Sequence, residues 1–184
     1  TVWTPLKEQT KPGDKIGILG LGGLGHMAIK FAKAFGNEVI AISSSDSKKD
    51  MALEHGATGF LVHTSDEEME KAAGTLDFIL VTIATSETVE FEKFFGLLRP
   101  RGTMCFVGMV PKFMIDTFTM GFTMTNCTTS NTGSIRDMKE MLEFCAKNKI
   151  GATVKKTPLS KINDALDELR SKQSAFRHVL VNDL

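Results

Sequence analysis

The stretch GLGGLG at residues 20–25 places four glycines in six positions, between an apolar run and a helix-like pattern. Each glycine inside a helix weakens it by about 1 kcal/mol relative to alanine, so this stretch is not a helix interior. Gly20, Gly22 and Gly25 follow the spacing G-x-G-x-x-G. After a buried strand, that spacing permits a tight turn, a close approach of the backbone to a pyrophosphate and close packing of helix on strand.

The segments around the glycines fit this interpretation. KIGILG at 15–20 is predicted to be a buried strand, residues 24–35 a helix, and EVIAIS at 38–43 a second strand. The N–H groups that begin such a helix can hold phosphates. For GLGGLG taken alone, a glycine-rich turn that binds no ligand is an alternative. A P-loop is excluded, because no Lys-Ser or Lys-Thr pair closes the loop. We interpret these residues as a dinucleotide site: Gly20, Gly22, Gly23, Leu24 and Gly25.

Strands and helices alternate along the rest of the chain. Further strands are predicted at 58–63, 76–83, 102–109, 153–157 and 177–181, and further helices at 47–56, 66–73, 87–98, 134–148 and 160–171. Several of the strands are apolar almost throughout, which is typical of strands buried on both faces. The order predicts an α/β fold, with a doubly wound (Rossmann), mostly parallel sheet and helices on both faces.

The end of the second predicted strand bears on the choice of coenzyme. An NAD site usually has a carboxylate there, whereas this chain has SSSDSKK at 43–49. A carboxylate would repel the 2′-phosphate of NADP by roughly 4 kcal/mol at 4 Å and an effective dielectric of 20. Hydroxyls avoid that repulsion, and Lys48 can supply a counter-charge, so we predict NADP. Two alternatives stay open: Ser45 or Asp46 only caps the next helix, or Asp46 turns inward and selects NAD.

Composition excludes several classes of protein. The 22 Lys and Arg balance the 22 Asp and Glu, so no basic field is available for nucleic acid. No apolar stretch is long enough to cross a membrane. The three cysteines, without a CxxC pair, predict neither disulfides nor a zinc knuckle, and favour a reducing compartment such as the cytoplasm. Because the chain begins at Thr1 without Met, we expect a fragment, and a removed leader stays open.

The segments GLGGLGHMAIKFAKAFG, ISSSDSKK, EMLEFCAKNKI and INDALDELRSKQSAFRHVLV together resemble the zinc-dependent alcohol dehydrogenases of the medium-chain superfamily. The likeness is closest to the NADP-preferring, cinnamyl alcohol dehydrogenase-like branch. It implies a connecting segment at 1–14, a dinucleotide-binding domain at 15–150 and a C-terminal return segment at 151–184. In that family an N-terminal catalytic domain, expected to be absent from this chain, binds the zinc. The implied reaction passes hydride between a primary alcohol or aldehyde and the nicotinamide.

The resemblance also implies roles for individual residues. It assigns the pyrophosphate to Gly22, Gly23 and Leu24, and the 2′-phosphate to Ser43, Ser44, Ser45 and Lys48. It places Thr82 and Ile83 beside the ribose and the bridging region, and assigns the nicotinamide side to Gly108, Met109, Val110, Ser130, Asn131 and Thr132. Arg177 matches an arginine near the family's C-terminus. Thr129 replaces a family glycine, and no catalytic or metal-binding residue is assigned to this chain.

Three further expectations concern partners, side chains and rival functions. The Met- and Phe-rich segment 109–128 predicts a homodimer through the sheet edge. His26 is expected to pack near the glycine loop without a catalytic role, and Cys105 and Cys145 to be inert core thiols. The alternatives to an alcohol dehydrogenase are a zinc-free quinone oxidoreductase-type relative and a non-catalytic module that senses NADP(H).

Overall fold

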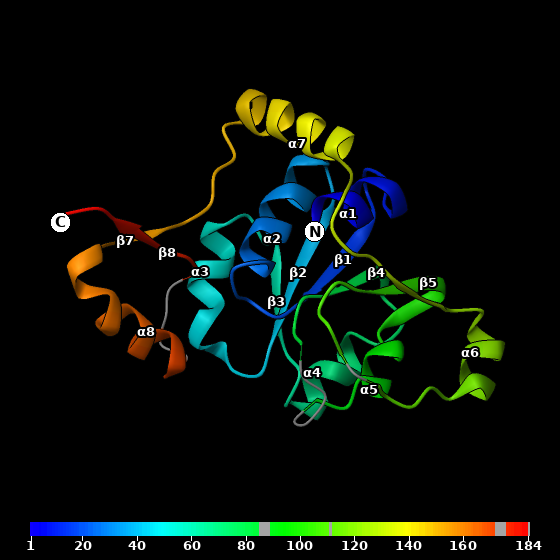
Figure 1. Ribbon diagram of the computed structural model, residues 1–184. Helices are drawn as coiled ribbons and strands as arrows, with labels where there is room; N and C mark the ends of the chain where they lie inside the picture. Colours follow the sequence, from blue (N-terminus) through cyan, green and yellow to red (C-terminus); the bar gives the residue numbers. More distant parts are fainter. Residues whose placement is uncertain (85–88, 111, 172–175, 184) are drawn as a thin grey trace.

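The computed structural model describes residues 1–84, 89–110, 112–171 and 176–183 (Figure 1). Its centre is a six-stranded sheet of order β3-β2-β1-β4-β5-β6, in which every neighbouring pair is parallel. The strands are β1 Lys15–Leu19, β2 Glu38–Ser43, β3 Gly59–Val62, β4 Leu76–Val81, β5 Leu98–Phe106 and β6 Asn126–Thr129. This order confirms the predicted doubly wound fold.

Helices cover both faces of the sheet, and each face has its own apolar core. Figure 1 shows α1, α2 and α7 over one face, with α4 and α5 over the other. On the first face Ile16 and Ile18 pack with Trp3 and Phe31, whereas on the second Ile79 packs among the phenylalanines of α5. The helices are α1 Trp3–Gln9, α2 Gly25–Ala34, α3 Lys49–Glu54, α4 Asp66–Lys71, α5 Glu92–Phe95, α6 Thr117–Thr123, α7 Ile135–Asn148 and α8 Ile162–Arg170.

The structure differs from the predicted elements in three segments. The helix predicted at 87–98 is only α5 in the described residues, while residues 87 and 88 lie outside them. β5 begins at Leu98 instead of 102, although Arg101 has φ 69° in the left-handed region. β5 pairs with β4 both before and after this irregularity, at Leu98 and again from Thr103. The turn-like residues between them therefore lie within one strand. α6 and β6 occupy the segment for which no element is predicted.

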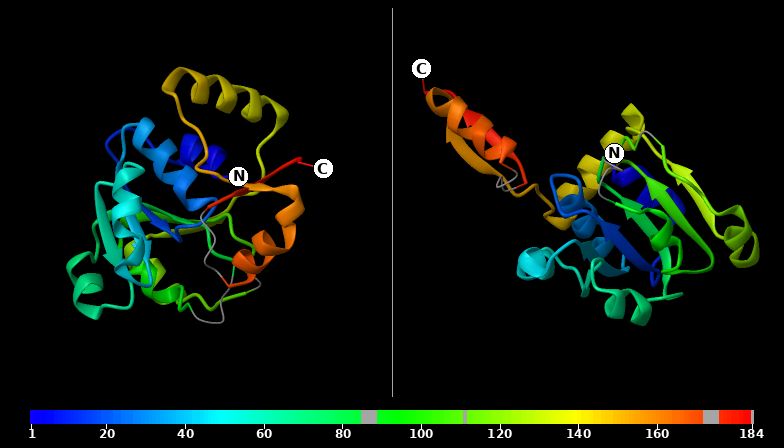
Figure 2. Two further views of the ribbon diagram at one scale, coloured as in Figure 1. Left: turned by 90° about the vertical axis from the view of Figure 1, so that its left-hand side faces the viewer. Right: turned by 90° about the horizontal axis from the view of Figure 1, so that it is seen from below.

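The C-terminal residues form a separate small unit. β7 Lys155–Pro158 and β8 His178–Val181 make a two-stranded parallel sheet with α8 beside it. Figure 2 shows this unit projecting from the main body, to which residues 149–154 connect it. Among the described residues, no helix has both the length and the apolar character that a membrane span requires.

Candidate functional site

The glycine loop lies at the carboxyl end of β1, beside the carboxyl end of β4. Thr82 follows β4, and its hydroxyl donates to the backbone carbonyls of Leu19 at 3.0 Å and Gly20 at 3.1 Å. The sheet order reverses direction between β1 and β4, and ligands of such sheets bind in the crevice at this point. The predicted loop and Thr82 therefore meet where a dinucleotide is expected.

The glycines of the loop serve different purposes. Gly20 has φ +98°, and a Cβ on it would come within 2.8 Å of the Thr82 hydroxyl. A Cβ on Gly25 would overlap the carbonyl oxygen of Gly20, because α2 begins directly against the loop. A Cβ on Gly22 would meet nothing within 4 Å. Gly20 and Gly25 are thus required by the fold, whereas Gly22 borders open space that a ligand can occupy.

Arg177 lies against the same loop, although it comes from the C-terminal unit. A Cβ on Gly23 would overlap the Arg177 guanidinium group. Leu24 stands at the N-cap position of α2, so the first backbone N–H groups of that helix follow directly. The loop therefore combines a helix N-terminus with a nearby cation, and both attract phosphate groups.

The serine-rich rim follows β2. Ser43 ends the strand half-buried, while Ser44, Ser45 and Lys48 are exposed. The Lys48 ammonium group donates to the carbonyl of Leu21 at 3.4 Å, so its charge lies at the glycine loop. Ser45 occupies the N-cap position of the short 3-10 helix Asp46–Lys48 without a side-chain capping bond. Its hydroxyl lies 2.9 Å from that of Ser47 instead, so the capping interpretation does not explain it.

A pocket of about 520 Å³ opens beyond the carboxyl ends of β5 and β6. Five predicted residues line it: Gly108, Met109, Val110, Ser130 and Asn131. A Cβ on Gly108 would overlap the carbonyl of Ile83, so Ile83 lies directly beside this pocket. Thr132 does not join the pocket, because it lines a separate hollow with Trp3 and Asp137 at the start of α7. Thr129, which stands where the family has a glycine, lines the pocket as well. So do Phe106, Val107, Phe113 and Cys127, which no sequence pattern marked as site residues.

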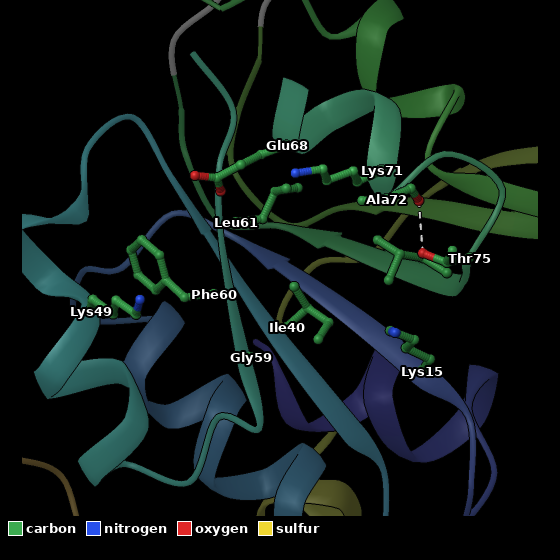
Figure 3. Close-up of a pocket in the computed structure, with 11 residues that line it drawn as sticks. Lys15, Ile40, Lys49, Gly59, Phe60, Leu61, Glu68, Lys71, Ala72 and Thr75 are labelled. Carbon is green, nitrogen blue, oxygen red and sulfur yellow. Dashed lines mark hydrogen bonds between the residues drawn. The ribbon is translucent and has the colours of Figure 1, made fainter. Parts of the chain in front are cut away.

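A second pocket, of about 430 Å³, lies beside the edge strand β3 and α4, with Lys15 of β1, Ile40 of β2 and Leu76 of β4 also in its lining (Figure 3). Lys15 pairs with Glu38 at 3.1 Å, and Lys71 pairs with Glu67 at 2.6 Å. The Glu68 carboxylate already accepts the backbone N–H of Val62 at 2.8 Å. These charged groups serve the local structure, and none of the predicted site residues lines the pocket.

His26 is more closely involved in the site than its sequence position indicated. Its side chain is buried, and its Nδ1 lies 3.1 Å from the carbonyl oxygen of Gly22. The expectation that it packs near the loop is confirmed. The i, i+4 spacing from Gly22 across the helix start was the available signal for this contact.

The described residues include neither a cluster of metal ligands nor an activated thiol at Cys105. Across residues 1–84, 89–110, 112–171 and 176–183, no group of three or more His, Cys, Asp or Glu side chains could hold a metal ion. The described residues therefore do not fit a zinc site. Cys105 is buried in the core, and burial raises the pKa of its thiol to about 11, which keeps it protonated and inert.

Comparisons with known proteins agree with this geometry. The family model "Zinc-binding dehydrogenase" matches residues 23–147. A probable cinnamyl alcohol dehydrogenase 2 of Picea abies is 39% identical over 98% of this chain, which covers 51% of that protein. A cinnamyl alcohol dehydrogenase structure from Sorghum bicolor superimposes with a TM-score of 0.90 at 34% identity, covering 100% of this chain and 52% of the other.

The corresponding enzyme of Helicobacter pylori, solved in complex with NADP(H), has a TM-score of 0.82 at 29% identity, covering 98% of this chain and 51% of the other. The chain thus spans about half the length of the curated relatives that it matches. It belongs to the zinc-binding dehydrogenase family, the zinc-dependent alcohol dehydrogenases of the medium-chain superfamily, and corresponds to their dinucleotide-binding portion.

Proposed function

We propose that this chain binds NADP(H) as the coenzyme-binding part of an alcohol dehydrogenase. The pyrophosphate would lie over Gly22, Gly23 and Leu24, beside the open space at Gly22. Arg177 would neutralise it from the C-terminal side. The pyrophosphate would thus be held by backbone N–H groups and a cation, and such groups bind phosphates well.

The observation that carries the proposal is the position of Lys48. Its ammonium group reaches the carbonyl of Leu21, next to the open space at Gly22 and beside an uncharged rim of Ser43, Ser44 and Ser45. A 2′-phosphate there would meet a cation and hydroxyl donors. The relative from Helicobacter pylori, which was solved with NADP(H), supports the same coenzyme.

The reaction that we propose is hydride transfer between a small alcohol or aldehyde and the nicotinamide. NADP(H) supplies the hydride acceptor or donor. The pocket beside Gly108, Met109 and Val110 would take the nicotinamide ring, with Ser130 and Asn131 on its other wall and the ribose side at Thr82 and Ile83. Since the described residues do not fit a zinc site, we propose that the zinc of the complete enzyme is bound outside this chain.

We also propose how the chain is divided into parts and how it assembles. Residues 1–14 would connect to the catalytic domain, 15–150 would bind the dinucleotide, and 151–184 would return toward the catalytic domain. We further propose a homodimer through the edge strand β6 and α6, because Met114, Phe118 and Phe122 are exposed there. The three cysteines of the chain are free, which fits a reducing compartment, and we propose that the protein is located in the cytoplasm.

Titration with NADPH and with NADH, followed by the change in nicotinamide fluorescence, tests the coenzyme. We expect saturable binding of both, with NADPH at least tenfold tighter, a preference that corresponds to about 1.4 kcal/mol. Equal affinities, or tighter NADH binding, would refute the role of the serine and lysine rim.

A further inference from the structure

His26 joins two parts of the chain that are far apart in sequence. It is 1% exposed, its Nδ1 lies 3.1 Å from the carbonyl oxygen of Gly22, and its Nε2 lies 3.2 Å from the backbone nitrogen of Thr153. A carbonyl can only accept a hydrogen bond, and a backbone N–H can only donate one. The two contacts therefore specify one form of the ring, the neutral imidazole with its proton on Nδ1.

The segment that His26 holds is the one that carries Arg177. Two residues after this contact the chain enters β7, where the N–H of Lys155 donates to the carbonyl of Arg177 at 2.8 Å. Phe176, which precedes Arg177, packs on the His26 ring with centroids 4.5 Å apart. The Arg177 guanidinium group returns to the loop at Gly23. A closed set of contacts thus runs from the loop through His26 and the C-terminal unit back to the loop.

We propose that neutral His26 is a positioning residue, which holds the C-terminal unit against the glycine loop and so places Arg177 at the phosphates of a bound dinucleotide. This inference rests on the proposed function. Protonation of His26 at Nε2 would set that N–H against the N–H of Thr153, and two donors cannot bond. The link then opens, Arg177 loses its fixed position, and the affinity for the dinucleotide falls.

The surroundings of His26 favour the neutral ring at neutral pH. Four ionisable groups surround the ring and its partners, namely Lys30, Glu54, His55 and Arg177. Burial lowers the pKa of His26, and the charges of Lys30, His55 and Arg177 lower it further, although its bond to Gly22 opposes them. Lys30 also donates to the carbonyl of Gly151 at 2.7 Å, so its charge is held beside the linked segment.

The first test is independent of any dinucleotide. Nitrogen-15 NMR of the imidazole side chains of the unliganded chain at pH 7.5 distinguishes a protonated from an unprotonated ring nitrogen. We expect His26 to show a protonated Nδ1 and an unprotonated Nε2. A protonated Nε2 would overturn the inference, whereas a chain that has the expected tautomer but binds no dinucleotide would refute the proposed function alone.

The second test separates the two hydrogen bonds with His26→Asn and His26→Gln. An Asn amide nitrogen can stand near the place of Nδ1 and donate to Gly22, but Asn is too short to reach Thr153. A Gln side-chain oxygen can reach the place of Nε2 and accept from Thr153. We expect His26→Asn to weaken NADPH binding about tenfold at pH 7.5, and His26→Gln to restore most of that loss.

The pH profile of NADPH affinity completes this test. The 2′-phosphate itself gains a proton near about pH 6, so the quantity compared is the ratio of wild-type to variant affinity. Between pH 7.5 and 5.5 we expect the wild type to lose affinity relative to His26→Gln, and the control His63→Asn to behave as the wild type. A constant ratio, or wild-type affinity in His26→Asn, would overturn the inference. If either His26 variant does not fold, the nitrogen-15 NMR measurement of the His26 tautomer tests the inference alone.

Discussion

The carbonyl oxygen of Gly20 occupies the place that a Cβ on Gly25 would need. Gly20 turns the chain out of β1 with φ +98°, and Gly25 begins α2. The helix can therefore start against the strand end only because Gly25 has no side chain. Four residues of loop are held between these two positions, and the N-terminus of α2 is directed at the space over Gly22.

Alanine substitutions separate the glycine that the fold needs from the one that a ligand needs. Gly25→Ala must displace a backbone carbonyl, so we expect it to lower the free energy of unfolding by about 3 kcal/mol. Gly22→Ala meets no atom within 4 Å, so we expect a change within about 0.5 kcal/mol and at least tenfold weaker NADPH binding. Urea unfolding and NADPH titration measure the two effects. Equal destabilisation by both substitutions would contradict this division.

Lys48 and Lys49 are a matched pair for testing coenzyme choice. Lys48 reaches the glycine loop, whereas Lys49, the first residue of α3, lines the separate pocket beside β3 and α4. We expect Lys48→Gln to weaken NADPH binding about tenfold, because a charge-assisted bond to the 2′-phosphate is lost, and to leave NADH binding nearly unchanged. Lys49→Gln should alter neither affinity. The ratio of the two dissociation constants is the measurement, and an unchanged ratio in Lys48→Gln would refute the assignment.

The sequence predicted the sheet well because its strands are signalled locally. Apolar runs such as 15–20 and 38–43, separated by helices, permit few arrangements other than a doubly wound sheet. The predictions failed where long-range pairing decides the structure. Leu98 joins β5 because Leu76 pairs with it, and β6 forms because β5 offers an edge, although neither segment has a strong pattern of its own.

The same distinction applies to the site. The glycine loop has a local signature, whereas the contact of Arg177 with Gly23 depends on how a distant segment folds back. The bond between His26 and Thr153 has the same origin, since 127 positions separate the two residues. Thr132 lies apart from the pocket of Ser130 and Asn131 because α7 begins with the capping box of Ser134, and the preceding residues border α1.

Stability should fall when the solution becomes mildly acidic. Burial lowers the pKa values of His26, His55 and His63 in the folded chain, so the unfolded chain binds protons first as the pH falls below about 6.5. The contribution of these histidines is therefore complete above that pH and declines below it, by at most about 1.4 kcal/mol for each unit by which a pKa is lowered. The shifted carboxyl groups, such as Asp137, titrate at lower pH and do not contribute in this window.

Urea midpoints at pH 7.5 and pH 5.5 check this expectation. The midpoint should be lower at pH 5.5, and the difference should be smaller in His63→Asn, which removes one of the three groups without touching the glycine loop. A midpoint that does not change between the two pH values would show that the histidines stay equally protonated in the folded and unfolded chains.

The proposed homodimer can be tested on α6. Phe118 and Phe122 are 73% and 75% exposed, and their rings pack only 4.8 Å apart between centroids, so they form one apolar surface. Replacing both with Glu would bury two unpaired charges in each subunit's side of the interface, at a cost of several kcal/mol. Because both positions are exposed in the single chain, its folding stability should change little. We expect the double variant to sediment as a monomer at tens of micromolar, where the wild type is a dimer. Leu169→Glu, on an exposed apolar position of α8, is the control and should remain dimeric. A wild-type monomer, or a dimer that survives the double substitution, would place the subunit contact elsewhere or remove it.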